Sequence, residues 1–336
     1  MAKVTVLGAG GWGTALAMAA LGKGHETALW TPFAEEAAHI MQHREQEKLL
    51  PGVKIPEEIG VTTDIRTADG SDITIVAVPS QAVRETAKKL RAAENPGIVV
   101  NVAKGIEAGT YLRMSQVLAE ELPGARIAVL SGPSHAEEVA RGVPTSVVVA
   151  SADLQAAEAV QQALMSRALR IYTHEDIVGV ELGGAFKNII ALAAGICDGL
   201  GLGDNTKAAL MTRGLTEIAR LGVSLGAKEN TFAGLAGIGD LVVTCTSMHS
   251  RNRRFGILVG KGEAPETALR EVGTVEGYHA VKTAWELAKR QKVEMPITEQ
   301  CYHVLYEHCP AREAIGHLMG RPGRMERDSS WLADKK

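Results

Sequence analysis

KVTVLGAGGWGTALAMAA, residues 3–20, joins a β-branched run to an apolar helical pattern through a glycine-rich turn. The turn fits G-x-G-x-x-G: Gly8 permits a tight turn, Gly10 lets the backbone approach a pyrophosphate, and Gly13 lets the helix pack closely on the strand. The N-terminus of that helix favours negative charge. With a strand before it and a helix after it, the stretch predicts a dinucleotide-binding turn; a purely structural glycine turn is the alternative.

The rest of the first half alternates short β-branched runs with helix-length segments, as a parallel sheet with crossover helices requires. Predicted strands are 3–7, 26–30, 72–78, 98–102, 127–130, 145–150 and 169–172, and predicted helices are 15–22, 34–48, 81–93 and 152–166. After about residue 175 the strand signals nearly stop. Two long helices are predicted within 177–226, with a polar break at 198–206, and shorter helices follow from Thr231.

These patterns predict an α/β protein of two domains. An N-terminal Rossmann-type doubly wound sheet, residues 1–175, precedes an all-α C-terminal domain, residues 176–325, and a polar tail, residues 326–336. The helix after strand 127–130 is expected to begin near His135.

Composition narrows the class of protein. Lys plus Arg total 36 and Asp plus Glu total 39, which gives a net charge of -3 and no basic footprint for nucleic acid or a membrane surface. The apolar run 189–196 is far shorter than a bilayer requires. The four cysteines form no Cys-x-x-Cys pair, so we expect inert thiols and no metal site. We expect a soluble cytoplasmic protein.

Polar residues follow several predicted strands, where ligands of an open sheet bind. Ala103-Lys104-Gly105 follows one strand and Ser131-Gly132-Pro133-Ser134 follows the next. Lys104 is either a ligand-binding residue or a solvated loop lysine. The serines are able to cap the following helix and to bind a ligand, since the two roles are compatible.

Lys187 lies within a helix that is apolar nearly all round, 178–193. Such a helix should be buried, and burying an ammonium group is expensive unless it has partners or loses its proton. Gly183 and Gly184 lie one turn before it on the same face, leaving a smooth surface where another molecule could press close. The alternative is a structural lysine that snorkels to the surface.

A second polar cluster follows Asp240. Ser250, Arg251 and Asn252 at a helix N-terminus would offer hydroxyl, guanidinium and amide donors to a phosphate. A solvated basic start of a helix is the alternative.

The end of the second strand governs the choice between NAD and NADP, because an acidic residue there takes the ribose diol and an arginine takes a 2′-phosphate. Thr31-Pro32-Phe33 offers neither. Glu35 and Glu36 come later, and a solvated first helical turn is one interpretation of them, so the choice between NAD and NADP stays open.

The chain resembles bacterial NAD(P)-dependent glycerol-3-phosphate dehydrogenases over nearly its whole length. Five stretches follow that family's pattern in order: GAGGWGTALA (8–17), VNVAKGIE (100–107), SGPS (131–134), ELGGAFKN (181–188) and GDLVVTC through SRNRRFG (239–256). The resemblance implies reversible reduction of dihydroxyacetone phosphate to sn-glycerol 3-phosphate, the backbone precursor of glycerophospholipids.

The resemblance also implies residue roles. Cofactor contacts would come from the turn glycines and their neighbours and from later residues, namely Gly8, Gly10, Gly11, Trp12, Gly13, Lys104, Ala136, Arg251, Val275 and Glu276. Substrate contacts would come from Lys104, Gly132, Ser134, Lys187, Asp240, Ser250, Arg251 and Asn252. Lys187 would be the proton acceptor, with Lys104 and Asp240 in the same catalytic set and no metal.

Two departures separate this chain from the family pattern. Many relatives carry an arginine where this chain has Thr31-Pro32, so their NADP preference does not transfer. The family often has two valines before the glutamate, whereas this chain has Thr274-Val275-Glu276. The cofactor contact that the resemblance implies at Val275 is therefore placed only to within one residue.

A lysine with a reference pKa of about 10.4 must be perturbed to accept a proton near pH 7. We predict that burial and the like charge of Lys104 lower the pKa of Lys187 more than Asp240 raises it. A hydroxyacid dehydrogenase and a non-catalytic dinucleotide sensor are the alternative functions. The oligomeric state stays open, with a homodimer through the long alanine-rich helices as one alternative.

Overall fold

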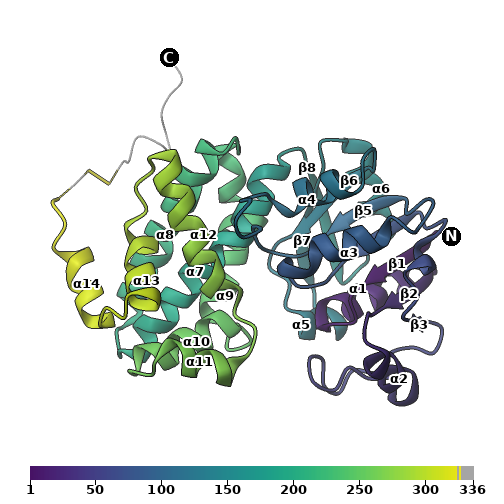
Figure 1. Cartoon of the computed structure of the whole chain (residues 1–336), viewed down its shortest axis with the longest axis horizontal. Coiled ribbons are helices and arrows are strands. Elements are labelled where there is room, and N and C mark those ends of the chain that lie inside the picture. Colours follow the sequence, from purple (N-terminus) through teal and green to yellow (C-terminus); the bar gives the residue numbers. More distant parts are fainter. Residues whose placement is uncertain (324, 327–336) are drawn as a thin grey trace. The chain divides into compact units, whose positions relative to one another are not determined.

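The structure is a computed structural model that describes residues 1–323, 325 and 326. By its internal contacts the chain divides into two compact units, Met1–Ile177 and Val178–Lys336. In Figure 1 the first unit runs from purple to teal and the second from teal to yellow. The polar tail predicted for 326–336 lies outside the described residues, apart from Glu326.

The first unit is built on an eight-stranded sheet with strand order β3-β2-β1-β4-β5-β6-β7-β8. The strands are β1 (Lys3–Leu7), β2 (Glu26–Trp30), β3 (Gly60–Thr62), β4 (Ile73–Val76), β5 (Ile98–Asn101), β6 (Ile127–Ser131), β7 (Thr145–Ala150) and β8 (Leu169–His174). The order 3-2-1-4-5-6 is that of a Rossmann-type sheet, which confirms the predicted fold class. The all-parallel expectation was wrong at one place, because β7 pairs antiparallel with β6.

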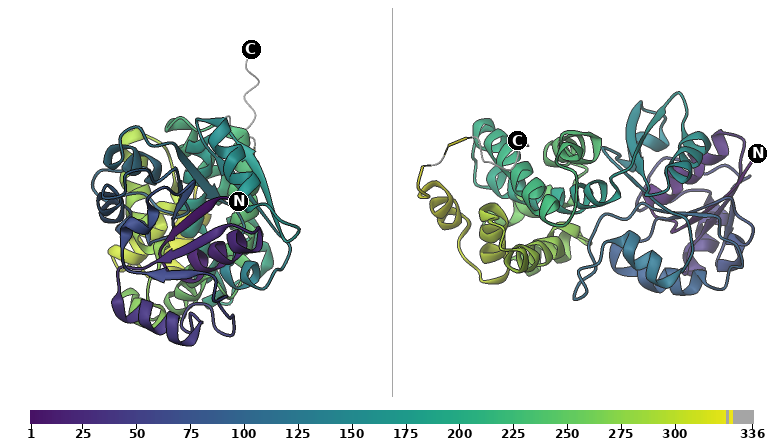
Figure 2. Two further views of the ribbon diagram at one scale, coloured as in Figure 1. Left: turned by 90° about the vertical axis from the view of Figure 1, so that its right-hand side faces the viewer. Right: turned by 90° about the horizontal axis from the view of Figure 1, so that it is seen from above.

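Helices cover both faces of this sheet (Figure 2). They are α1 (Gly11–Gly22), α2 (Ala34–His43), α3 (Val83–Leu90), α4 (Met114–Glu121), α5 (Ala136–Ala140) and α6 (Leu154–Leu164), with short 3₁₀ turns η1 (Ile65–Ala68) and η2 (Ser80–Ala82). Successive strand residues point to opposite faces. Accordingly Val100 packs with α1 and α6 in one core cluster, and its neighbour Val99 packs with α3 and α4 in the other.

Three strands, β1, β2 and β7, have the predicted bounds. The three-residue strand β3 and helix α4 were not predicted. Helix α2 was expected to reach residue 48 but ends at His43, because Arg44 takes a left-handed conformation with φ 52° and its N–H bonds the carbonyl of Ile40.

The second unit is helical throughout its described part, as predicted. Its elements are α7 (Ile177–Gly199), α8 (Asp204–Ser224), η3 (Glu229–Ala233), η4 (Leu235–Gly239), α9 (Asp240–Thr246), α10 (Arg251–Gly260), α11 (Pro265–Val272), α12 (Glu276–Gln291), α13 (Pro296–Tyr306) and α14 (Ala311–Met319). Every residue of α7 from Gly179 to Cys197 is buried. By length and hydropathy α7 would also suit a membrane span, but 89% of its apolar window is packed inside the protein, as expected of a core helix.

Helices α7 and α10 approach each other through glycines. A Cβ atom at Gly195 would lie 2.1 Å from the carbonyl oxygen of Arg253, and one at Gly256 would lie 2.1 Å from that of Leu192. Any side chain at these positions would push the helices apart. The contact therefore fixes the start of α10 against α7, which carries Lys187.

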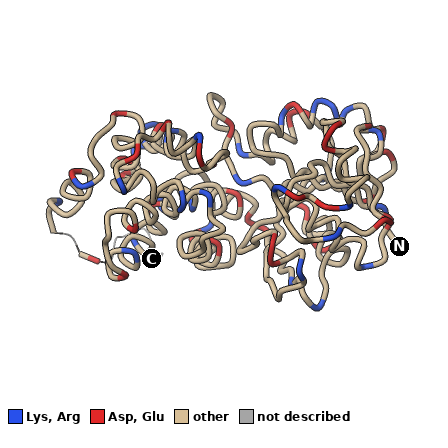
Figure 3. Tube along the Cα trace, turned by 90° about the horizontal axis from the view of Figure 1, so that it is seen from below, with Lys and Arg blue, Asp and Glu red and all other residues tan. Residues whose placement is uncertain are grey.

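Charged residues of both signs are interspersed along both units (Figure 3), in keeping with the net charge of -3. Three of the cysteines, Cys197, Cys245 and Cys301, are buried, and burial raises the pKa of each thiol. Cys309 is partly exposed, and its pKa is raised as well. These shifts keep the thiols protonated, as expected of inert cysteines.

Glu217 of α8 is a buried carboxyl group that ties α8 to the first turn of α13. It accepts hydrogen bonds from the backbone N–H of Ile297 at 2.7 Å and of Thr298 at 3.2 Å. Only 3% of the residue is exposed. Burial outweighs these hydrogen bonds and the charge of Arg220, and it raises the pKa of Glu217 to about 7 from 4.5.

We predict that Glu217 makes the protein less stable as the pH rises from about 4.5 to about 7. In this window the native carboxyl group holds a proton that the unfolded chain has released, so acid favours the native state, by on the order of 3 kcal/mol. Thermal unfolding between about pH 5 and pH 8 should show a flatter pH dependence of Tm for Glu217→Gln. Glu299→Gln, exposed in the same turn of α13, is the control. An unchanged slope in Glu217→Gln would contradict the assignment.

Candidate active site

The glycines of the turn after β1 differ in whether the fold leaves room for a side chain at their position. Gly8 has φ +122°, and a Cβ atom there would lie 2.7 Å from the carbonyl oxygen of Ala77. A Cβ atom at Gly13 would lie 2.0 Å from the carbonyl oxygen of Gly8. A Cβ atom at Gly10 would meet nothing closer than Leu49 Cδ1 at 3.8 Å. A purely structural turn therefore explains Gly8 and Gly13 but leaves Gly10 unexplained.

The start of α1 fits a bound pyrophosphate. Its N-cap is Gly10, which has no side chain to occupy the first backbone N–H groups of the helix. Ala136 at the start of α5 lies beside the turn, because a Cβ atom built at Gly11 would be 3.5 Å from Ala136 Cβ. Trp12 is half-buried and packs on the core cluster around α1. The predicted cofactor residues Gly11 and Ala136 are thus brought together.

Lys104 is not a solvated loop lysine. It is half-buried, and its Nζ donates a 3.0 Å hydrogen bond to the carbonyl oxygen of Gly132. Ser134 Oγ donates to the same carbonyl oxygen at 2.9 Å. The structure therefore gathers Lys104, Gly132 and Ser134 at the carboxyl ends of β5 and β6. Within the described residues, the buried hydroxyl of Ser131 beside them has no hydrogen-bond partner.

An ion pair braces the loop that carries Lys104. Arg84 of α3 binds Glu107 with two parallel hydrogen bonds of 2.7 Å, and Thr110 donates to the same carboxylate at 2.5 Å. Bidentate arginine–carboxylate pairs are geometrically specific. The hydrogen bonds from Arg84 lower the pKa of Glu107. This brace sets the course of the chain between β5 and α4.

In the second unit Lys187 is buried, with 6% of the residue exposed, so the snorkelling alternative was wrong. Its Nζ forms a hydrogen-bonded ion pair with Asp240 Oδ1 and donates to Thr244 Oγ1 at 2.6 Å. Thr244 in turn donates to the backbone carbonyl of Asp240 at 2.6 Å. We call Lys187, Asp240 and Thr244 the lysine cluster. Sequence reasoning missed Thr244, although its position one helical turn after Asp240 was a usable signal.

The predicted open surface at Gly183 is filled by the chain itself. A Cβ atom at Gly183 would lie 2.5 Å from the carbonyl oxygen of Ala236, in the turn η4 that leads into α9. The expectation that another molecule presses on this glycine was therefore wrong. The close approach instead brings Asp240, the first residue of α9, to Lys187.

Asn252 links three helices beside the lysine cluster. Its Nδ2 donates to Asn188 Oδ1 of α7 at 2.9 Å, and its Oδ1 accepts from the backbone N–H of Gly277 at 2.8 Å. Gly277 is the second residue of α12, which begins at Glu276 after the buried N-cap Val275. The predicted residues Asn252, Val275 and Glu276 are thus brought together, and Asn188 joins them as a residue that the sequence analysis did not name.

The other members of the predicted phosphate site start α10. Ser250 is the N-cap and accepts a hydrogen bond from the backbone N–H of Arg253 at 3.2 Å. Arg251 is exposed in the first turn. Arg253 instead binds Asp198, with Nη2 and Oδ2 2.8 Å apart. Among the arginines at the start of α10, Arg251 is therefore exposed and placed in the first turn, where it is able to bind an anion.

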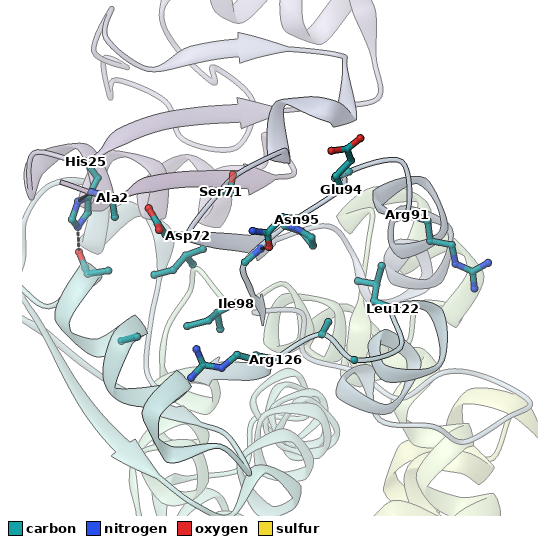
Figure 4. Close-up of a pocket in the computed structure, with 18 of the residues that line it drawn as sticks. Ala2, His25, Ser71, Asp72, Arg91, Glu94, Asn95, Ile98, Leu122 and Arg126 are labelled. Atoms are coloured by element: carbon teal, nitrogen blue, oxygen red, sulfur yellow. Dashed lines mark hydrogen bonds between the residues drawn. The ribbon is translucent and has the colours of Figure 1, made fainter.

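A cavity of about 1020 Å³ lies at the amino ends of the strands, opposite the carboxyl ends that carry the candidate site of this unit (Figure 4). Ala2, Asp72, Ile98 and Arg126 line it, at the amino ends of the strands. Open sheets bind ligands at the carboxyl ends of their strands. None of the predicted site residues lines this cavity, and the described residues contain no cluster of metal-ligating side chains.

Known proteins resemble this chain over nearly its whole length. The family model for the NAD-dependent glycerol-3-phosphate dehydrogenase N-terminus matches residues 3–157, and the model for the C-terminus matches residues 176–316. A glycerol-3-phosphate dehydrogenase [NAD(P)+] of Desulfitobacterium hafniense (strain Y51) is 55% identical over 97% of this chain and 93% of its own length. One of Thermoanaerobacter sp. (strain X514) is 54% identical over 96% of this chain and 98% of its own length. The crystal structure of glycerol-3-phosphate dehydrogenase from Coxiella burnetii, 37% identical, superimposes with a TM-score of 0.91 over 95% of this chain and 99% of that one.

We predict that alanine substitution separates the two kinds of glycine. Gly13→Ala should lower the stability of the protein by about 2 kcal/mol or more, because its methyl group collides with the backbone at Gly8. Gly10→Ala should leave Tm nearly unchanged, because Gly10 has φ -71° and open surroundings. Gly10→Ala should nevertheless weaken NADH binding about tenfold or more in fluorescence titration, because its methyl group occupies space for the pyrophosphate. Unchanged NADH binding would restore the purely structural interpretation.

Proposed function

The chain belongs to the NAD-dependent glycerol-3-phosphate dehydrogenase family and is an oxidoreductase that uses NAD or NADP, and we propose how its own residues carry out the reaction. The reaction is the reversible interconversion of sn-glycerol 3-phosphate and dihydroxyacetone phosphate. The buried lysine cluster carries this proposal, because a lone cation in an apolar helix, held by a carboxylate and a hydroxyl, is suited to move a proton. Formation of glycerol 3-phosphate from dihydroxyacetone phosphate with NADH or NADPH tests it directly.

The glycine turn holds the coenzyme in this proposal. Gly10, Gly11, Trp12 and Ala136 bind it at the start of α1, where an open backbone and a helix N-terminus suit a pyrophosphate. When bound, the nicotinamide accepts or supplies the hydride of C2. Lys104, fixed at the carbonyl of Gly132, places a positive charge at the carboxyl ends of the strands, where it attracts a phosphorylated ligand.

Lys187 moves the proton. In oxidation its Nζ accepts the proton of the C2 hydroxyl as the C2–H bond breaks, and in reduction the ammonium group returns a proton to the carbonyl oxygen. Asp240 stabilises the ammonium form and, with Thr244, fixes the direction of Nζ. The contact with Asp240 raises the pKa of Lys187, whereas burial lowers it. That burial, together with the like charge of Lys104, prevails and leaves this pKa low is still a prediction.

The start of α10 binds the phosphate group of the substrate. Arg251 offers an exposed guanidinium fork, and the N-terminus of α10 offers the favourable end of its dipole. Asn252 orients this turn through its bonds to Asn188 and Gly277, and one N–H of its amide remains to bind substrate. Ser250 caps the helix and keeps its hydroxyl proton for donation.

The cellular role follows from the product. We assign the protein to the cytoplasm, in line with its bacterial relatives, and to the supply of glycerol 3-phosphate for glycerophospholipid synthesis. The hydroxyacid dehydrogenase alternative loses its support, because both family models match glycerol-3-phosphate dehydrogenases. The non-catalytic sensor loses its support for the same reason.

We predict that Lys187→Met lowers kcat about 10²- to 10⁴-fold, because it removes the proton acceptor and keeps the size of the side chain. NADH binding by fluorescence titration and the far-UV circular dichroism spectrum should be retained, which separates lost chemistry from lost folding. Lys282→Met, exposed on α12, is the control and should behave as wild type. Turnover by Lys187→Met within a few-fold of wild type would overturn the proposed role.

We predict that Arg251→Ala acts through the phosphate of the substrate. It should lower kcat/KM for glycerol 3-phosphate about 10- to 100-fold, the expected loss for a charge-assisted hydrogen bond. Oxidation of free glycerol should change little, because glycerol has no phosphate group. Arg254→Ala, exposed in the same helix, is the matched control. Equal losses on both substrates would contradict a phosphate-binding role for Arg251.

A further inference from the structure

The residues after β2 meet the adenosine half of a dinucleotide in a Rossmann-type sheet. In this chain Thr31 is buried directly after β2, and Glu36 lies in the first turn of α2. The sequence suggested that Glu35 and Glu36 form a solvated first helical turn. That interpretation holds for the exposed Glu35 and was wrong for Glu36, which is half-buried.

Both carboxylate oxygens of Glu36 are held in place. Oε2 accepts a hydrogen bond from Thr31 Oγ1, and Oε1 accepts one from Gln46 Nε2 at 3.0 Å. Gln46 is itself buried, with 6% of the residue exposed. A carboxylate fixed at both oxygens keeps its position when a ligand arrives.

The same amide nitrogen of Gln46 also donates to the backbone carbonyl of Ala9 at 2.8 Å. Ala9 lies between Gly8 and Gly10 in the glycine turn. A single amide group therefore separates the carboxylate of Glu36 from the turn that holds the pyrophosphate. The ribose next to the pyrophosphate is the part of the ligand within reach of this carboxylate.

The chemistry of this arrangement distinguishes the two coenzymes. Each carboxylate oxygen has a second lone pair, so Glu36 is able to accept hydrogen bonds from the ribose hydroxyls of NAD. A 2′-phosphate would bring negative charge against the carboxylate without a donor between them. The strand end, Thr31-Pro32-Phe33, supplies no cation to offset this negative charge. Arg44, at the end of α2, donates instead to the carbonyls of Glu57 and Ile59.

We propose that Glu36, positioned by Thr31 and Gln46 beside the glycine turn, binds the adenosine ribose and makes the enzyme select NAD(H) over NADP(H). The inference rests on the proposed function, since it concerns the coenzyme of the same reaction. It names the residue and the direction of selectivity, neither of which follows from membership of a family that uses NAD or NADP.

Isothermal titration of the full-length protein, without substrate, tests the proposal. The probes are NADH and NADPH, together with the fragments 5′-AMP and adenosine 2′,5′-bisphosphate, which differ only in the 2′-phosphate. Wild type should bind NADH and 5′-AMP at least about tenfold more tightly than their 2′-phosphorylated counterparts. Glu36→Gln keeps the size of the side chain and removes its charge, so it should reduce this ratio about tenfold or more. Glu35→Gln, one residue earlier in the same turn, should leave the ratio unchanged.

The outcomes separate this proposal from the proposed function. Equal or tighter binding of NADPH by wild type, or an unchanged ratio in Glu36→Gln, would overturn the role of Glu36. Turnover of dihydroxyacetone phosphate in those cases would leave the dehydrogenase function in place. Binding of neither dinucleotide by wild type would overturn both. Thermal unfolding of Glu36→Gln shows that the variant is folded when its ratio is measured.

Discussion

The ion pair between Lys187 and Asp240 is the contact on which the chemistry proposed for the helical unit depends. An ammonium group inside a helix that is buried all round is tolerated only if a counter-charge reaches it. Asp240 reaches it because Gly183 lets the backbone at Ala236 approach α7 so closely that a Cβ atom would collide. The glycine before the lysine and the carboxylate after the turn η4 are therefore parts of one arrangement.

How far the sequence could predict this arrangement depends on the distance along the chain between its parts. Lys187 was predictable, because a cation within an apolar helix is a local signal. Its partners Asp240 and Thr244 are 53 and 57 residues away, and nothing local to Lys187 points to them. Asp240 entered the prediction only through the family resemblance. The bond between Glu36 and Gln46 spans 10 residues, but it requires α2 to end at His43. The left-handed residue that ends the helix is Arg44 rather than a glycine, so the sequence gives no local signal for this end.

The glycine turn shows a different limit of sequence reasoning. A motif gives equal weight to each of its glycines, whereas the structure separates them by what would fill the space of a side chain. Gly8 and Gly13 are required by contacts between β1, α1 and the residue Ala77. Gly10 meets no such contact. The doubly wound class and the two covered faces followed from the alternating pattern of strands and helices. The short strand β3 and the reversal of β7 did not, because strand pairing and direction are not decided by composition.

Two buried titratable groups in the helical unit, Glu217 and Lys187, illustrate why burial alone does not identify a reactive residue. Glu217 of α8 accepts hydrogen bonds from backbone N–H groups at the start of α13, so its contacts are explained by a structural role that joins these two helices. The lysine cluster joins α7 to α9, yet Gly183 already allows η4, which leads into α9, to pack closely on α7. Buried ion pairs contribute little net stability compared with apolar residues of the same size, because desolvation offsets their attraction. Stability therefore does not account for Lys187, whereas proton transfer requires an amine in a fixed direction and shielded from water.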